Sequence, residues 1–458
     1  MRFRRFFSAF FCAVLLLTLC PLAGAAEDKT LPSIDIQAKA ALLLDQNTGK
    51  IVYAKNEHEE LYPASLTKIM TALLVLRAVD EGKLTMDQSI TASESAFETL
   101  HDDGSSAGIK AGEVLTVRQL LQCLLIVSAN EAGTILAETV SGSVSAFVEE
   151  MNAEAEALGC ENTHFVNPTG LHDSQHYTSA WDLYLIASEA LKYPDFLPIC
   201  DSIKEVIPAT NLSSERVLRT TNYLLDTWRA LGYRYRNAHG IKTGSTDAAG
   251  QCLVSSAVRG SRTLVSVVLG AERVAKDNGS GYIVESFTET ARLFDWGFDN
   301  FAPRQVLDAN ELIQEVPVAL SKQVSTVAVH PAEDANAMLP KDLDVAELTR
   351  TVTLDNETAL APITAGDRLG EITVSYGDTE YVTVPLLAVA DVSASRFLLA
   401  RHGIGEFFSR PSARIAILAL LVMVAALVLW FRLYGRNRRY GKGGGSRYRH
   451  RAYHGRRH

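Results

Sequence analysis

One apolar run near the end of the chain constrains the fold more than any other feature. Ile415 to Phe431 is a stretch of 17 residues without a charged side chain, close to the shortest helix that crosses a bilayer. Arg414 and Arg432 flank this run, and arginines at such positions reach the membrane surface. We therefore predict a transmembrane helix over residues 415–431, preceded by a juxtamembrane linker over 396–414.

A basic tail follows the predicted span. Residues 432–458 carry ten Lys and Arg and no acidic residue, and positive charge next to a span marks its cytoplasmic side. The simplest role of this tail is to set the orientation and to contact anionic lipid. The sequence thus predicts a single-pass protein of the cell membrane, with the residues before the span outside the cytoplasm.

The N-terminus has the three parts of a secretory signal peptide. Met1 to Arg5 is basic, Phe6 to Leu19 is apolar, and Ala23 to Ala25 supplies small residues. We predict a signal peptide over residues 1–26, with cleavage near its last two alanines. This signal agrees with an extracytoplasmic location for the body.

The composition indicates a globular body, with 47% hydrophobic and 21% charged residues. The net charge of −9 combines basic ends with a strongly acidic body, which repels nucleic acid, so no nucleic-acid partner is expected. The body has four cysteines and no CxxC pair that would indicate zinc. Their even number outside the cytoplasm permits disulfides, but the apolar surroundings favour buried thiols at Cys123, Cys160, Cys200 and Cys252.

The body has two parts that differ in their predicted secondary structure. The first part mixes both kinds of element: strands are predicted at 40–44, 51–54, 251–258 and 263–269, and helices at 64–76, 115–126, 144–158, 177–191 and 286–298. From Glu311 to Val392 the texture changes to short β-rich runs broken by turns. We predict a mixed domain over 27–303 and a small, separate all-β domain over 304–395.

Three short motifs in the mixed domain carry candidate chemistry. In Ser65-Leu66-Thr67-Lys68, a spacing of three places a hydroxyl and an amine one helical turn apart. An alcohol there can attack a carbonyl if the amine of Lys68 is neutral enough to take its proton. Roughly one such pair is expected by chance in this chain, so the alternative is an N-cap serine beside a solvated lysine.

The other two motifs differ in specificity. Ser128-Ala129-Asn130 is the only Ser-x-Asn in the chain, but it too is expected about once by chance, and it could be the polar end of a helix. Lys242-Thr243-Gly244 is much rarer by chance. Its glycine lets a substrate backbone approach closely, and its lysine and threonine can hold a carboxylate.

Taken in order, the three motifs resemble those of the serine penicillin-recognising superfamily, whose SxxK, SxN and KTG motifs follow one another along the chain in the same order. The resemblance narrows to the low-molecular-mass D-alanyl-D-alanine carboxypeptidases and covers residues 35–300, including Phe165 to Leu171 and Thr221 to Leu225. It implies an α/β (α+β) fold: a β-lactamase/transpeptidase-like domain of antiparallel sheet with helices, then a small all-β domain and a C-terminal transmembrane helix. No cofactor and no metal are expected.

The resemblance also implies the roles of the residues. Ser65 would be the nucleophile on the carbonyl between the last two D-alanines of a peptidoglycan stem peptide, Lys68 its base and Ser128 a proton relay. Substrate would be bound by Asn130, Lys242, Thr243, Gly244 and Ser245, and the backbone amides of Ser65 and Ser245 would form the oxyanion hole. β-Lactams would be covalent inhibitors. Many relatives have His where this chain has Ser245, and Gly where it has Ala129, which leaves the substrate preference open.

Several other readings stay open at this stage. A D,D-endopeptidase would use the same acyl-enzyme, and a β-lactamase shares the motifs but usually wants Ser-Asp-Asn and a deacylating Glu. A metallopeptidase would need a ligand set, for which the segment His172 to His176 is the nearest candidate, without HExxH. An inert, membrane-tethered binding protein would keep the fold without turnover.

Overall fold

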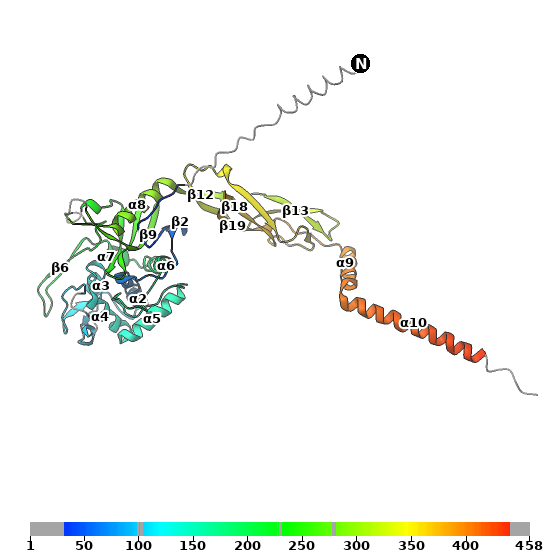
Figure 1. Ribbon diagram of the computed structural model, residues 1–458, viewed down its shortest axis with the longest axis horizontal. Coiled ribbons are helices and arrows are strands. Elements are labelled where there is room, and N and C mark those ends of the chain that lie inside the picture. The colour runs from blue at the N-terminus through cyan, green and yellow to red at the C-terminus, as the bar shows by residue number, and fades with distance from the viewer. Residues whose placement is uncertain are drawn as a thin grey trace, which may run out of the picture. The chain divides into compact units, whose positions relative to one another are not determined.

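The computed structural model describes residues 32–439 except 99, 101–103, 227, 229–230 and 277–280. The predicted signal peptide and most of the predicted basic tail lie outside the described residues. Tertiary contacts divide the chain into two units, one built from residues up to Val306 with two short later segments, and the other holding most of the β-rich part from Leu307 onward. The elements of both are labelled in Figure 1.

A five-stranded antiparallel sheet organises the first unit, in the order β2-β1-β9-β8-β7. Its strands are β1 Ala40–Asp45, β2 Lys50–Lys55, β7 Ala238–Thr246, β8 Gly250–Arg259 and β9 Arg262–Ala271. The strands predicted at 40–44, 51–54, 251–258 and 263–269 are confirmed. Their apolar residues, such as Leu42 and Leu43 on adjacent positions of β1, fill both faces of the sheet.

Helices cover both faces of this sheet (Figure 1). Leu43, Leu253 and Leu264 pack on one side against α8 Glu285–Asn300. Leu42, Val254 and Val265 belong to the larger core on the other side. That core also holds α2 Lys68–Asp80, α3 Val117–Ile126, α4 Asn130–Ser141, α5 Val144–Ala157, α6 Ala180–Ala190 and α7 Phe196–Cys200.

Short elements connect these helices and strands. Two-stranded pairs are formed by β3 Ser89–Thr91 with β4 Val114–Thr116, β5 Lys204–Ile207 with β6 Arg216–Arg219, and β10 Arg273–Ala275 with β11 Tyr282–Val284. Single 3-10 turns are η1 Ala64–Thr67, η2 Ser95–Phe97 and η3 Leu231–Tyr233.

Three helix boundaries differ from the sequence prediction. The helix expected from residue 64 begins as the separate turn η1, and α2 starts only at Lys68. The helix expected from 115 begins at Val117, because Thr116 caps it with a capping box to Gln119. Likewise, the Ser179 side chain caps α6 by accepting from the Asp182 amide, so residues 177–179 stay outside that helix.

The second part of the chain is β-rich, as predicted, and includes a six-stranded sheet in the order β16-β18-β19-β14-β13-β17. Its strands are β13 Gln314–Ala319, β14 Thr326–Pro331, β16 Thr349–Leu354, β17 Ala359–Leu360, β18 Arg368–Tyr376 and β19 Thr379–Ala388. A separate pair joins β12 Phe301–Leu307 to β15 Ala335–Pro340, and η4 Val345–Glu347 precedes β16. Alternating buried residues such as Ile372 and Val374 show that the β18 strand has one packed face.

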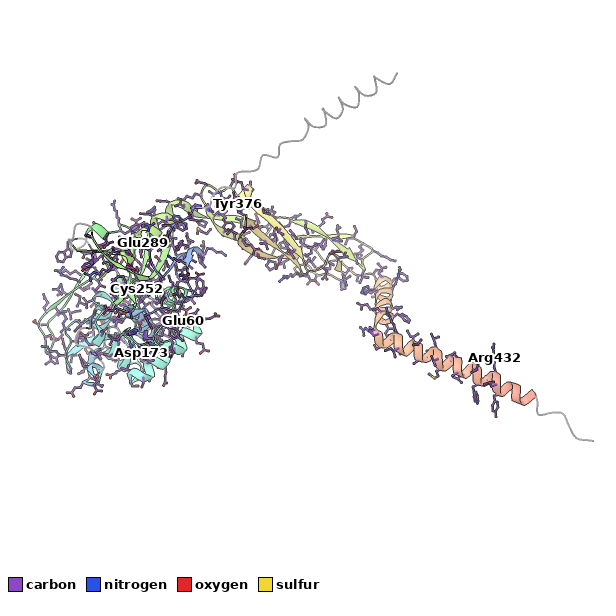
Figure 2. The ribbon with its side chains drawn as sticks, in the orientation of Figure 1. Glu60, Asp173, Cys252, Glu289, Tyr376 and Arg432 are labelled. Carbon is purple, nitrogen blue, oxygen red and sulfur yellow. The ribbon has the colours of Figure 1, made fainter. Side chains whose placement is uncertain are left out.

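Two helices end the described chain, α9 Arg396–Ser409 and α10 Pro411–Arg439. Within Pro411–Tyr434 of α10, the most apolar 18 consecutive residues have a mean hydropathy of 2.6, and none of them is buried. Arg432 lies toward the end of this helix (Figure 2). By length and composition the helix can cross a membrane, and it contains the predicted span 415–431.

Candidate active site

Ser65 lies in the 3-10 turn η1, immediately before α2. Lys68 is the first residue of α2, so the Ser-x-x-Lys spacing bridges a turn and a helix instead of lying within one helix. The two side chains nevertheless meet, with Nζ of Lys68 3.0 Å from Oγ of Ser65. The hydroxyl and the amine are thus paired directly.

Lys68 is fully buried, and its Nζ has two further oxygen partners. It donates to Oδ1 of Asn130 at 2.8 Å and to the backbone oxygen of Thr169 at 2.6 Å. Burial, and then the charge of Lys242, lower the pKa of Lys68 well below its ordinary value against a smaller opposing effect of Glu131. A neutral amine has two N–H groups for these two oxygens and one lone pair left for the hydroxyl of Ser65. The arrangement therefore suits a neutral Lys68 amine that accepts a proton from Ser65.

Ser128 lies in the connection between α3 and α4, and Asn130 is the first residue of α4. Ser128 has a positive φ of 66°, a backbone region that few residues with a side chain adopt. Its Oγ accepts a hydrogen bond of 3.0 Å from Nζ of Lys242. Asn130 opens α4 and contacts Lys68, so this one segment reaches both lysines.

The third motif lies on β7, at an edge of the five-stranded sheet. Lys242 is buried, and its Nζ also donates to the backbone oxygen of Thr243 at 2.8 Å. Burial lowers the pKa of Lys242 to about 7. Oγ1 of Thr243 lies 2.6 Å from Oγ1 of Thr221, and Oγ of Ser245 accepts from the side-chain Nε2 of Gln251 at 2.8 Å.

Gly244 is where β7 passes closest to the nucleophile turn. A Cβ built on Gly244 would lie 2.9 Å from the oxygen of Pro63 and 3.2 Å from the nitrogens of Ser65 and Leu66. Only a residue without a side chain fits this approach. The contact holds the strand against the turn, so Ser65 and Ser245 line the same cleft.

That cleft has a volume of about 460 Å³. Its polar lining includes Ser65, Ser105, Ser128, Thr221, Thr243 and Ser245. Its wider lining adds the side chains of Tyr223, Tyr233, Arg273, Tyr282 and Phe287. A cleft lined by both polar and aromatic residues suits a peptide ligand.

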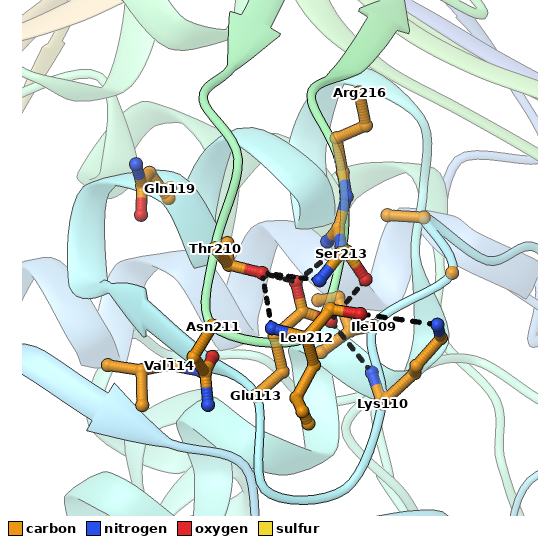
Figure 3. A network of polar contacts seen from close by, with 12 residues as sticks. Ile109, Lys110, Glu113, Val114, Gln119, Thr210, Asn211, Leu212, Ser213 and Arg216 are labelled. Carbon is orange, nitrogen blue, oxygen red and sulfur yellow. Dashed lines mark hydrogen bonds and ion pairs between the residues drawn. The ribbon is translucent and has the colours of Figure 1, made fainter.

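The wall that carries Ser105 is held by two buried carboxylates. Glu131 accepts from Oγ of Ser106 and from the backbone amide of Ala107, both at 2.7 Å. Figure 3 shows the second, Glu113, which accepts from Thr210 at 2.7 Å and from the Lys110 amide at 3.0 Å and pairs with Arg216. These contacts tie the cleft wall to α4 and to the β5–β6 hairpin.

The segment His172 to His176 does not form a metal site. Among the described residues no group of three His, Cys, Asp or Glu side chains could hold a metal ion. His176 is buried, with Nε2 2.8 Å from Oγ1 of Thr67 and Nδ1 accepting from the Val166 amide at 3.1 Å. Both of its nitrogens are therefore engaged with protein groups.

The four cysteines that the structure describes in the body are free thiols. Cys123, Cys200 and Cys252 are buried as expected, and Cys160 is half-buried. Cys252 lies on β8 and is labelled in Figure 2. Burial raises the pKa of the Cys252 thiol to about 11, so it is not a nucleophile at neutral pH.

The structure adds three residues that the motifs did not give. The backbone oxygen of Thr169 contacts Lys68, the Thr221 hydroxyl contacts Thr243, and His176 contacts Thr67 beside Ser65. Both Thr169 and Thr221 lie in segments that carry the family resemblance, so this resemblance is the sequence feature that could have indicated them. No spacing rule predicts a contact made by a backbone carbonyl or across about a hundred residues.

Comparison with known proteins gives matches over nearly the whole described chain. A family model described as D-alanyl-D-alanine carboxypeptidase matches residues 25–273, and one described as penicillin-binding protein 5, C-terminal domain, matches 301–394. The chain is 31% identical to the D-alanyl-D-alanine carboxypeptidase DacF of Bacillus subtilis, over 86% of this chain and 96% of that protein. It is 33% identical to a D-alanyl-D-alanine endopeptidase of Pseudomonas aeruginosa, over 48% of this chain and 67% of the relative.

Solved structures agree with these matches. The D-alanyl-D-alanine carboxypeptidase DacD from Francisella tularensis superposes with a TM-score of 0.66 at 28% identity, covering 80% of this chain and 95% of that one. Penicillin binding protein 5 from Haemophilus influenzae gives a TM-score of 0.61 at 29% identity, over 79% of this chain and 99% of its own. The transpeptidase-like α/β domain followed by a β-rich domain is thus the observed fold.

Proposed function

This chain belongs to the D-alanyl-D-alanine carboxypeptidase family, and we propose that it removes the terminal D-alanine from peptidoglycan stem pentapeptides through an acyl-enzyme on Ser65. The observation that carries the proposal is the position of Lys68. Its buried amine lies 3.0 Å from the Ser65 hydroxyl and has oxygen acceptors for both of its N–H groups. Burial and the neighbouring charge of Lys242 lower the pKa of this amine, which favours the neutral form that a general base requires.

Acylation begins when the Lys68 amine takes the proton of Ser65 and Oγ attacks the carbonyl carbon of the penultimate D-alanine. Negative charge then develops on the carbonyl oxygen. The backbone amides of Ser65 and Ser245 donate to that oxygen in the proposal, since both residues line the cleft and β7 packs against the turn at Gly244.

Collapse of this intermediate breaks the carbon–nitrogen bond between the two D-alanines. The proton that Lys68 took passes through the Ser128 hydroxyl to the leaving nitrogen, so D-alanine departs as an amine. Water then attacks the ester carbonyl and gives a proton to Lys68. The proton returns to Oγ of Ser65 as the shortened peptide leaves as a carboxylic acid, which restores the enzyme; the released acid then gives its proton to water and becomes a carboxylate.

Substrate binding follows from the groups that remain free around this pair. Oδ1 of Asn130 accepts from Lys68, so its Nδ2 is left to donate to a peptide oxygen of the substrate. Lys242 and Thr243 form a cationic end with the Thr221 hydroxyl beside them. In the proposal this end binds the terminal carboxylate.

The test uses the full chain in detergent and a peptidoglycan pentapeptide, read by mass spectrometry. We expect a tetrapeptide and free D-alanine in equal amounts, and no product from Ser65→Ala. An intact pentapeptide after prolonged incubation with a folded wild-type chain would contradict the proposal.

A D,D-endopeptidase is the second candidate, because one relative is described as such an enzyme. It would cleave the bond between a D-alanine and the side chain of a neighbouring stem peptide through the same acyl-enzyme. A cross-linked dimer of stem peptides distinguishes the two activities. Release of monomers at a rate equal to or above that of D-alanine would favour the endopeptidase.

The same nucleophile would be acylated by β-lactams, which are the inhibitors that the penicillin-binding family implies. A β-lactamase requires fast deacylation in addition, and Ala129 stands where class A enzymes have Asp. An inert binding protein would not need the buried, paired lysine. Because this chain lacks that Asp, we propose that the penicilloyl group is released slowly.

The proposed site of action is the outer face of the cell membrane, with α10 as a single anchor. Pro411–Tyr434 is long and apolar enough to cross a bilayer, and the basic residues after it favour a cytoplasmic C-terminus. An anchored enzyme at this face can reach newly exported stem peptides.

A further inference from the structure

His176 lies next to the nucleophile turn, although the proposed reaction does not use it. It is 2% exposed, and the segment before it passes closely over η1. A Cβ built on Gly170 would lie 1.8 Å from the backbone oxygen of Ala64 and 2.9 Å from Oγ1 of Thr67. The loop from Phe165 to His176 thus packs directly on the residues that flank Ser65.

Hydrogen bonding fixes which nitrogen of His176 carries the proton. The Thr67 hydroxyl donates its only proton to the backbone oxygen of Ala64 at 2.9 Å. It can therefore only accept from Nε2 of His176, which lies 2.8 Å away. The Val166 amide donates to Nδ1, so that nitrogen holds the lone pair, and the imidazole is neutral with its proton on Nε2.

Two consecutive hydrogen bonds therefore end beside the nucleophile. Nε2 of His176 donates to the Thr67 hydroxyl, and that hydroxyl donates to the Ala64 oxygen. Ala64 has a positive φ of 47°, which an L-residue adopts only where its surroundings hold it. The same loop supplies the Thr169 oxygen to Lys68. One loop therefore supports both members of the reacting pair.

We propose that His176 is a positioning residue: its Nε2–H orients the Thr67 hydroxyl, which holds the Ala64 peptide and thereby the turn that presents Ser65 to Lys68. This inference deepens the proposed function, since it concerns the rate at which Ser65 is acylated. It predicts that loss of the Nε2 donor slows acylation more than loss of the Nδ1 acceptor.

Amide side chains separate the two nitrogens. In His176→Gln the amide nitrogen reaches the position of Nε2 and can donate to Thr67, while in His176→Asn the amide oxygen reaches the position of Nδ1 and can accept from Val166. Thr67→Val removes the hydroxyl at constant shape. His164→Gln is the matched control, because His164 directly precedes this loop and its Nδ1 contacts the Gln175 oxygen at the surface.

The measurement is the second-order rate constant for acylation of the full chain by a fluorescent penicillin in detergent, with the thermal unfolding midpoint recorded for each variant. We expect His176→Asn and Thr67→Val to lose on the order of tenfold to a hundredfold in this rate. His176→Gln should stay within about threefold of wild type, and His164→Gln should equal it. The double variant His176→Asn/Thr67→Val should be no slower than Thr67→Val, since both changes break one chain of donors.

Two results would overturn the inference: a wild-type acylation rate in folded His176→Asn, or equal losses in the Gln and Asn variants that follow their unfolding midpoints. Because the probe is a penicillin, these results do not depend on pentapeptide turnover. Failure of wild type to release D-alanine would count against the proposed function alone.

Discussion

At the scale of single residues, the proposed reaction depends on the protonation states of two buried lysines. Lys68 must be neutral to take a proton, and Lys242 must be charged to bind a carboxylate. Burial lowers the pKa of both, and the charge of Lys242 lowers that of Lys68 further. A charged Lys242 helps to keep Lys68 neutral, whereas the lowered pKa of Lys242 limits the pH range over which Lys242 carries that charge.

This pair predicts a pH profile for acylation. Above its pKa of about 7, Lys242 of the free enzyme loses its proton and its attraction for the substrate carboxylate. We therefore expect the second-order acylation rate with an anionic penicillin to fall on the alkaline side, between about pH 7 and pH 9. Stopped-flow measurements across that range test this, and a rate that stays constant there would contradict the proposed role of Lys242.

Gly244 gives a second prediction at this scale. A methyl group in Gly244→Ala would lie 2.9 Å from the Pro63 oxygen and 3.2 Å from the Ser65 nitrogen, so β7 must move away from the turn. We expect a loss of about tenfold or more in acylation rate with a small change in unfolding midpoint.

The control for that substitution is Gly232→Ala, where a Cβ would meet nothing within 4 Å. The labelling rate of this control should equal that of wild type. Equal labelling by Gly244→Ala would show that the close approach of β7 is not needed for acylation.

At the scale of elements, the cleft wall depends on Glu113. Burial tends to raise the pKa of this carboxyl, but hydrogen bonds from Thr210 and the Lys110 amide, together with the charge of Arg216, outweigh burial and lower it. A carboxyl with a lowered pKa stabilises the fold above its unfolded pKa of about 4.3, and this contribution is lost as the pH falls below that value. The anchoring of the β5–β6 hairpin is therefore electrostatic (Figure 3).

Replacing this carboxylate should destabilise the unit. Glu113→Gln leaves Arg216 without its buried partner, which we expect to cost about 3 kcal/mol in the free energy of unfolding at pH 7. Urea denaturation checks this value, and the gap from wild type should narrow below about pH 4. Glu81→Gln removes an exposed pair with Lys83 and should leave the midpoint unchanged; a similar loss in both variants would argue against a special role for Glu113.

The elements also show what local sequence could predict. The central strands and α8 follow from apolar patterns that tertiary packing preserves. The pattern did not predict α4, which has Gly133 in its interior and begins within a functional motif at Asn130. Gly133 suits the fold because a Cβ there would lie 3.3 Å from the side chains of Leu124 and Thr169, a constraint that exists only after folding.

Site residues divide in the same way. The motifs that contain Ser65, Lys68 and Lys242 have spacings that reflect local geometry, so the sequence could predict these residues as candidates. The oxygen of Thr169 is a backbone atom and has no sequence signature. The contact of His176 with Thr67 joins positions 109 residues apart, and only the packing of the loop over the turn brings them together.

At the scale of the whole molecule, the proposed anchor α10 determines where the protein is located but contributes no residue to the cleft. A chain ending at Arg410 lacks α10 but keeps every residue of the cleft. We expect the full chain to float with liposomes and the shortened chain to stay in the aqueous fraction, with equal rates of penicillin labelling. Flotation of the shortened chain to the same extent would show that α10 is not the anchor.

The central claim is that Ser65, activated by a neutral Lys68, is the group that becomes acylated. Its most direct test is peptide mapping by mass spectrometry after brief exposure of the full chain to benzylpenicillin. We predict one penicilloyl group per chain, on the peptide that contains Ser65, and none in Ser65→Ala or Lys68→Met. An adduct on any other residue, or an unmodified Ser65 in the folded wild-type chain, would contradict the account.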